Sequence, residues 1–127
     1  MVDERGLPVR LCLTQGQTHD SRPAIGLLRG LRPGTDVVAD RAYDTNAILA
    51  HVAAHGAIAH VPTPSYRKQQ RRPDPAIYAA RNLIERFFCK AKHFRRLATR
   101  YDKLARNFLA TACLVATRLW TRYESTT

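Results

Sequence analysis

The chain has 127 residues, enough for one domain with a modest core, and 45% of them are hydrophobic, which excludes a disordered protein. Its net charge of +11 is unevenly placed. Residues 1–66 hold six basic and six acidic residues, whereas residues 67–127 hold fifteen basic and four acidic ones. A one-sided basic surplus indicates a polyanionic partner. Nucleic acid is the usual one, and an anionic membrane surface is the alternative.

The chain's three cysteines are odd in number, widely spaced and without zinc-site spacing, at Cys12, Cys89 and Cys113. They are typical of reduced thiols packed in the core of a cytoplasmic protein. No signal peptide is apparent, and the longest uncharged stretch near the C-terminus, residues 107–117, is too short to span a bilayer. We therefore expect a cytoplasmic location.

The N-terminal half alternates predicted strands and helices. In chain order we expect a strand, a helix, a strand, a helix and a strand, over residues 7–14, 21–31, 35–40, 45–55 and 57–62. Ser21 and Thr45 are the predicted N-caps of the helices, with Pro23 in the first turn of one and Gly56 after the end of the other. This alternation predicts parallel strands with right-handed crossovers.

The C-terminal half begins with a segment rich in proline and basic residues. Residues 63–75 hold three prolines and four basic residues without apolar periodicity, which predicts a loop or mobile linker. Helical patterns follow over residues 76–100 and 104–123.

Four residues of the first of these helices, Tyr78, Arg81, Glu85 and Lys92, fall within an arc of about 60° at helical spacing. One interpretation is a solvated stripe with an Arg–Glu pair that stabilises the helix by about 0.3 kcal/mol. The other is a carboxylate facing a groove, with cations placed to meet phosphates. Spacing alone leaves both open.

A second carboxylate, Asp40, ends the middle predicted strand. The carboxyl ends of parallel strands line the ligand crevice of open α/β sheets, and carboxylate oxygens suit a hard divalent cation. Phosphodiester chemistry commonly uses two such ions, roughly 3.5–4 Å apart. The alternative for Asp40 is a strand-end cap, and Asp44 is predicted to be a turn or helix-cap residue.

These residues resemble a known family. The pattern of Tyr78, Arg81, Glu85 and Lys92 resembles the Y-(2)-R-(3)-E-(6)-K signature of the DDE transposases of bacterial insertion sequences, four and five families. Residues 39–44 resemble the segment around that family's second catalytic aspartate, and the resemblance extends from Val2 to about residue 120.

The resemblance implies an α/β fold of the RNase H-like type. We expect it to be incomplete, with a short mixed sheet, flanking helices and a long basic C-terminal helical region. The expected organisation is one partial catalytic domain, 1–127, with a strand and helix core at 1–62, a basic linker at 63–75 and a helical region at 76–127.

The resemblance also implies a catalytic triad of two aspartates and one glutamate that binds two ions of Mg²⁺ or Mn²⁺. Asp40 matches the second aspartate and Glu85 the glutamate, which makes them the expected catalytic and metal-binding residues. Other residues are expected to bind double-stranded DNA at transposon ends and at the target. These are Tyr78, Arg81, Lys92, Arg95, Arg96, Arg67 and Lys68.

The family's first aspartate precedes a turn that matches the hairpin turn predicted at residues 3–6. We therefore expect a truncated transposase, or the second reading frame of a split gene, that is inactive alone. The alternative is an inactive DNA-binding remnant that could act as an inhibitor. The expected protein partner is a second copy or an upstream-frame product, without membrane binding, in the nucleoid of the bacterial cytoplasm.

Overall fold

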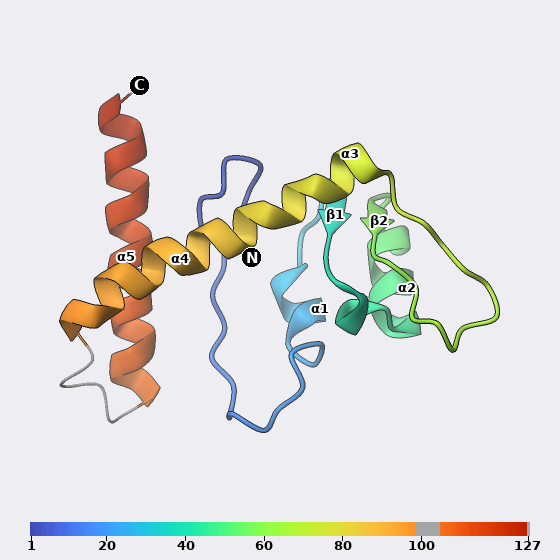
Figure 1. Ribbon diagram of the computed structural model, residues 1–127, viewed down its shortest axis with the longest axis horizontal. Helices are drawn as coiled ribbons and strands as arrows, with labels where there is room; N and C mark the ends of the chain where they lie inside the picture. The colour runs from blue at the N-terminus through green and yellow to red at the C-terminus, as the bar shows by residue number, and fades with distance from the viewer. Residues whose placement is uncertain (99–104, 127) are drawn as a thin grey trace. The chain divides into compact units, whose positions relative to one another are not determined.

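A computed structural model describes residues 1–98 and 105–126, and the side chains of residues 1–94 and 107–126 (Figure 1). The chain forms two compact units. The first, here called the sheet unit, comprises Thr14–Arg81. The second, the helical unit, comprises Met1–Leu13 and Asn82–Thr127.

The sheet unit contains a two-stranded parallel sheet. Strands β1 (Asp36–Val38) and β2 (Ile58–His60) are joined through helix α2 (Asn46–Ala54), which packs against β2 (Figure 1). Across the strands, Nε2 of His60 lies 2.8 Å from Oδ1 of Asp36. The predicted parallel strand–helix–strand order is confirmed, since a helical crossover is the usual way to bring two strands side by side in parallel.

Helix α2 has the ends that the sequence predicts. The hydroxyl of Thr45 accepts a hydrogen bond from the backbone N–H of Ile48 at 3.2 Å. Gly56 follows the helix with φ +65°, a conformation that favours glycine and ends a helix. Ile48 and Val52 bury the inner face of α2 against Ala24, and these three side chains form the core of the sheet unit.

The helical unit is built from helices α4 (Asn82–Ala98) and α5 (Ala105–Thr126). Its core combines one side chain of α4 and two of α5 with Leu7 from the N-terminal segment, and the helical members are Phe87, Val115 and Leu119. The indole Nε1 of Trp120 donates a hydrogen bond to the backbone oxygen of Pro8 at 2.8 Å. The N-terminal segment is thus held by apolar packing and by this indole bond.

The strand predicted at residues 7–14 is wrong. This segment forms only an isolated antiparallel bridge between Val2 and Pro8. Pro8 has no N–H to donate to a ladder, and Leu7 packs into the helical core instead of joining a sheet face. The described sheet is therefore parallel and two-stranded, not mixed.

The helix predicted at residues 21–31 shrinks to α1 (Ala24–Leu27). Ser21 is not its N-cap, because its hydroxyl hydrogen-bonds the His19 ring at 2.7 Å and the N-cap is Pro23. Glycines at positions 26 and 30 weaken a longer helix, and Gly30 takes φ +68° just beyond its end.

The long helix predicted at 76–100 begins earlier and in pieces. Asp74 caps α3 (Pro75–Tyr78) by accepting from Ala76 N at 2.9 Å, and the 3₁₀ turn η2 (Ala79–Arg81) joins α3 to α4. The last helix, α5, also runs slightly further than the predicted 104–123. Both differences lie at helix ends, where local patterns are least informative.

The three cysteines do not occupy the core that their apolar neighbours suggested. Cys12, Cys89 and Cys113 are all exposed free thiols, and other residues form the core of the helical unit. No helix in the described ranges is both long and apolar enough to cross a membrane.

Candidate functional site

Asp40 lies just beyond the carboxyl end of β1. The strand ends at Val38, and Asp40 is the N-cap of the 3₁₀ turn η1 (Arg41–Tyr43), with Oδ1 accepting the N–H of Ala42 at 2.9 Å. The side chain is half-buried, and no described residue donates to Oδ2. One oxygen therefore caps the turn, as one interpretation of the sequence expected, and the other can accept a ligand.

Tyr43 ends the same turn and is half-buried. Burial raises its pKa, and the negative charges of Asp20 and Asp40 raise it further. Tyr43 is therefore a neutral hydrogen-bond donor at ordinary pH. Asp20 is a residue that sequence reasoning passed over, because it lies in an irregular loop and only the folded chain brings its charge to bear on Tyr43.

Asp44 ends the turn, and its carboxylate is completely buried. Nε of Arg67 lies 2.8 Å from Oδ2 as an ion pair without hydrogen-bond alignment, and the guanidinium of Arg71 bonds Oδ1. Arg67 also donates to the backbone oxygen of Asp44 at 3.0 Å and to Oδ1 of Asn46 at 2.9 Å. Arg67, expected to bind DNA, thus has its guanidinium engaged within the protein.

The basic segment after β2, residues 63–72, contains no helix or strand, but hydrogen bonds within it connect its two ends. Backbone N of Arg71 donates to the hydroxyl of Thr63 at 2.8 Å, and that hydroxyl lies 3.3 Å from the backbone oxygen of Arg71. The Gln70 amide donates to the backbone oxygens of Pro64 and Arg67, at 3.1 and 2.6 Å. The predicted loop is therefore internally tied.

The signature residues are shared between the two units. Tyr78 in α3 and Arg81 in η2 are half-buried residues of the sheet unit, where α3 packs against β1. Glu85 and Lys92 are exposed residues of α4 in the helical unit. Glu85 lies in the first turn of α4, where a negative charge interacts favourably with the helix dipole.

The remaining predicted DNA-binding residues divide into two groups. Lys68 is exposed on the basic loop. Arg95 and Arg96 belong to α4, but their side chains lie outside the described part of the structure.

The oxygen donors fit a hard divalent cation in kind. Asp40 has one uncommitted carboxylate oxygen, and carboxylates are the ligands such ions prefer. Within the described residues, no three His, Cys, Asp or Glu side chains cluster closely enough to hold a metal by themselves. Asp40 therefore offers one oxygen that could hold such an ion.

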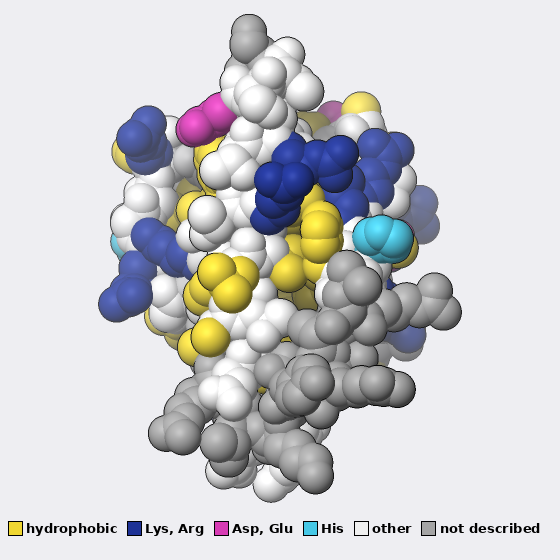
Figure 2. Space-filling view, turned by 90° about the vertical axis from the view of Figure 1, so that its left-hand side faces the viewer, with side chains coloured by type: hydrophobic (Ala, Val, Ile, Leu, Met, Phe, Trp, Pro, Cys, Tyr) yellow, Lys and Arg dark blue, Asp and Glu magenta, His cyan; other side chains and the backbone are white. Residues whose placement is uncertain are grey.

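Basic side chains outnumber acidic ones on one face of the molecule. On the face seen in Figure 2, Lys and Arg side chains are spread widely, while acidic side chains are few. Long-range attraction to a polyanion is the physical consequence of such a surface.

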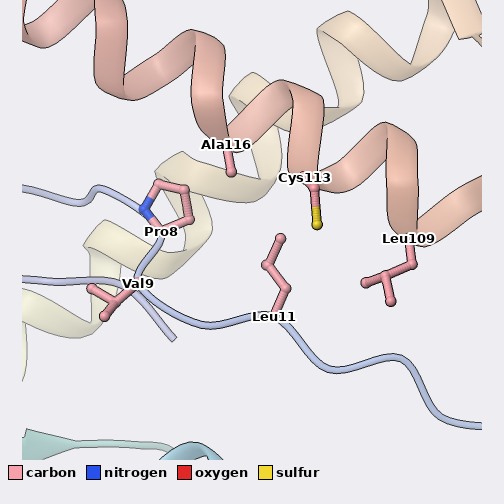
Figure 3. A pocket seen from close by; sticks show the side chains of 6 residues that line it. All are labelled: Pro8, Val9, Leu11, Leu109, Cys113 and Ala116. Carbon is pink, nitrogen blue, oxygen red and sulfur yellow. The ribbon is translucent and has the colours of Figure 1, made fainter.

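A pocket of about 330 Å³ lies in the helical unit, between the N-terminal segment and α5 (Figure 3). Its lining is apolar apart from one thiol, and comprises Pro8, Val9, Leu11, Leu109, Cys113 and Ala116. With no carboxylate or cation in its wall, this pocket suits neither a metal ion nor a phosphate.

Comparison with known proteins identifies the family. Residues 37–122, which include Asp40 and Glu85, match the family model described as "Transposase DDE domain". A protein of Brucella ovis named "Putative transposase for insertion sequence element IS6501" is 35% identical over 123 residues, covering 96% of this chain and 95% of that protein. No solved structure matches the chain. The chain belongs to the DDE transposases of insertion sequences.

Proposed function

We propose that this chain acts in the transposition of an insertion sequence and supplies two carboxylates, Asp40 and Glu85, to the metal site that cuts and joins DNA. The observation that carries the proposal is the state of Asp40. It follows the carboxyl end of a parallel strand and keeps one carboxylate oxygen free of the described residues. The family match covers both carboxylates.

Asp40 and Glu85 would hold divalent ions, Mg²⁺ or Mn²⁺, through oxygen. When bound, two such ions activate a water or a 3′-hydroxyl and stabilise the leaving oxygen of the phosphodiester. The turn that Asp40 caps restrains its carboxylate, and the exposure of Glu85 leaves it open to solvent and DNA. An RNase H-like arrangement within a single catalytic domain, 1–127, is part of the proposal.

DNA would be bound by basic and hydrogen-bonding side chains on both sides of Glu85 in the sequence. Tyr78 and Arg81 precede it, and Lys92 follows it on an exposed face of α4. We assign Lys68, Arg95 and Arg96 to the same role with double-stranded DNA, because phosphate contacts by Lys and Arg supply most of the affinity of such proteins. The assembled enzyme would be a homodimer, or a complex with an upstream-frame product.

The test is nicking of insertion-sequence end DNA in the presence of Mg²⁺ by the transposase that contains this sequence. Glu85→Gln and Asp40→Asn should each reduce nicking by at least about 10³-fold, because loss of a metal ligand removes transition-state charge stabilisation. Arg86→Gln, next to Glu85 and also exposed, is the matched control and should keep its activity within severalfold of the parent. Undiminished nicking by Glu85→Gln would refute the assignment.

A further inference from the structure

Asp44 is a buried carboxylate for which the proposed metal chemistry has no use. Its side chain has no exposure, whereas those of its partners Arg67 and Arg71 are 27% and 45% exposed. A buried charge is costly unless it is paired, so the folded unit favours the loop conformation that turns both guanidinium groups toward Asp44. The partners are 23 and 27 residues away in sequence, so Asp44 ties the loop to a distant part of the sheet unit.

The loop that Asp44 holds is also closed internally, by the Thr63–Arg71 and Gln70 bonds. It therefore has a defined shape without regular secondary structure. A preformed loop loses less conformational freedom on binding than a mobile one does, which favours affinity.

The cations of the loop fall into two classes. Arg67 and Arg71 pair with Asp44, whereas Lys68 and Arg72, each next in sequence to one of them, are exposed and form no ion pair with a described residue. The loop is open to solvent at Tyr66, which is 81% exposed. Arg67 and Arg71 can therefore hold the loop in place, and Lys68 and Arg72 can bind an anion.

We propose that Asp44 is a positioning residue that locks residues 63–72 into a preformed phosphate-binding element, in which Lys68 and Arg72 contact the DNA backbone. This inference rests on the proposed function for the identity of the anion. Asp40 begins the turn Arg41–Tyr43 and Asp44 ends it, so the brace fixes the loop to the turn that carries the metal-binding carboxylate.

The first experiment measures the brace without DNA. Trypsin should cleave Asp44→Asn after Arg67, Lys68 and Arg71 at least about tenfold faster than the parent, because cleavage follows the population of the opened loop. Cleavage after Arg29, outside the loop and the turn, should keep its rate, which distinguishes local release from unfolding. Arg71→Gln, altered at a partly exposed position, repeats the test at the remaining loop sites if the Asp44 variant fails to fold. Unchanged loop cleavage in the folded variants would overturn the brace.

The second experiment measures affinity for a DNA duplex over a range of salt concentrations. Asp44→Asn makes the chain more positive, so electrostatics alone would tighten binding, whereas loss of the preformed loop should weaken it severalfold. Lys68→Gln and Arg72→Gln should each flatten the slope of log K against log salt by about 0.9, the value for one phosphate contact. Both should leave tryptic cleavage after Arg71 unchanged.

Tighter binding by Asp44→Asn would overturn the proposal, since it would make Arg67 and Arg71 the DNA contacts and Asp44 their competitor. Unchanged salt slopes for both Lys68→Gln and Arg72→Gln would overturn it as well. If the parent chain binds no DNA, the proposed function fails, while the tryptic pattern still decides whether Asp44 braces the loop. The two failures are therefore distinguishable.

Discussion

Two aspartates at the ends of one short turn have opposite environments. Asp40 is half-buried and has one oxygen bound to the backbone, whereas Asp44 is fully buried between two arginines. Burial makes an ion pair costly to break and leaves Asp44 closed to solvent, while partial exposure leaves Asp40 able to take a cation. At this scale the environment, not the residue type, distinguishes a carboxylate oxygen that can accept a ligand from a carboxylate committed to ion pairs.

Tyr43 gives a pH test of the same turn. Burial, then the charges of Asp20 and Asp40, raise its pKa in the folded chain above the ordinary value of 10.0. A raised pKa means that the folded state holds the phenol proton more tightly. Its contribution to stability is therefore complete below the ordinary pKa and is lost as pH rises through the folded one. Urea midpoints measured from about pH 8 to about pH 11 should fall.

The control for this test is Tyr43→Phe, which keeps the ring and removes the titrating hydroxyl. Its midpoint should fall less steeply over the same range, because the contribution of the Tyr43 hydroxyl is gone. Some fall should remain, because the other tyrosines still titrate. An equal fall in both proteins would contradict the position assigned to Tyr43.

Among the elements, α2 has the most completely defined ends. Thr45 caps its first turn, Gly56 follows its last, and Ile48 and Val52 bury its inner face. Its boundaries are therefore set by local chemistry, which the sequence contains.

Thr45→Ala should lower the free energy of unfolding of the sheet unit by about 1 kcal/mol, because the backbone N–H of Ile48 loses its acceptor. Chemical denaturation followed by circular dichroism measures the loss. Thr45→Ser retains the hydroxyl and should restore most of the stability, so an equal loss in both variants would argue against the cap.

The elements also show what sequence can and cannot predict. The strands β1 and β2, their parallel direction and the cap of α2 follow from local patterns and were predicted. The segment 7–14 alternates like a strand, but pairing requires a neighbour, and its packing against α4 and α5 depends on residues over 70 positions away. Local pattern carries no signal for such contacts.

The candidate site divides in the same way. Asp40 and Glu85 were predicted as metal-binding residues from spacing and family resemblance, and both signals come from short stretches of sequence. The pairing of Asp44 with Arg67 and Arg71 spans more than 20 residues, so each residue alone resembled a turn acid or a solvated cation. The number of basic residues in the loop was visible in the sequence, but which of them face inward was not.

For the whole molecule, the uneven charge is the feature with the widest consequence. The neutral first half includes both strands, and the basic second half includes the loop cations and both long helices. Family membership implies binding to DNA, a polyanion that a basic surface attracts at long range.

This charge predicts a steep fall in DNA affinity with added salt. Lys92→Gln should reduce the slope of log K against log salt by about 0.9, because one phosphate contact and its counterion release are lost. Arg32→Gln, an exposed change in the neutral half, should leave the slope unchanged. Identical slopes for the two variants would show that Lys92 makes no phosphate contact.

The most direct measurement of the central claim, that Asp40 and Glu85 bind the metal, is metal rescue of nicking by the transposase that contains this sequence. Replacing either carboxylate by Cys should abolish nicking with Mg²⁺ and restore much of it with Mn²⁺, which accepts a sulfur ligand more readily. The corresponding Ala variants should stay inactive with both ions. Rescue of the Cys variants and not of the Ala variants is the predicted result. The same response from Cys and Ala, or full activity of either variant with Mg²⁺, would contradict the claim.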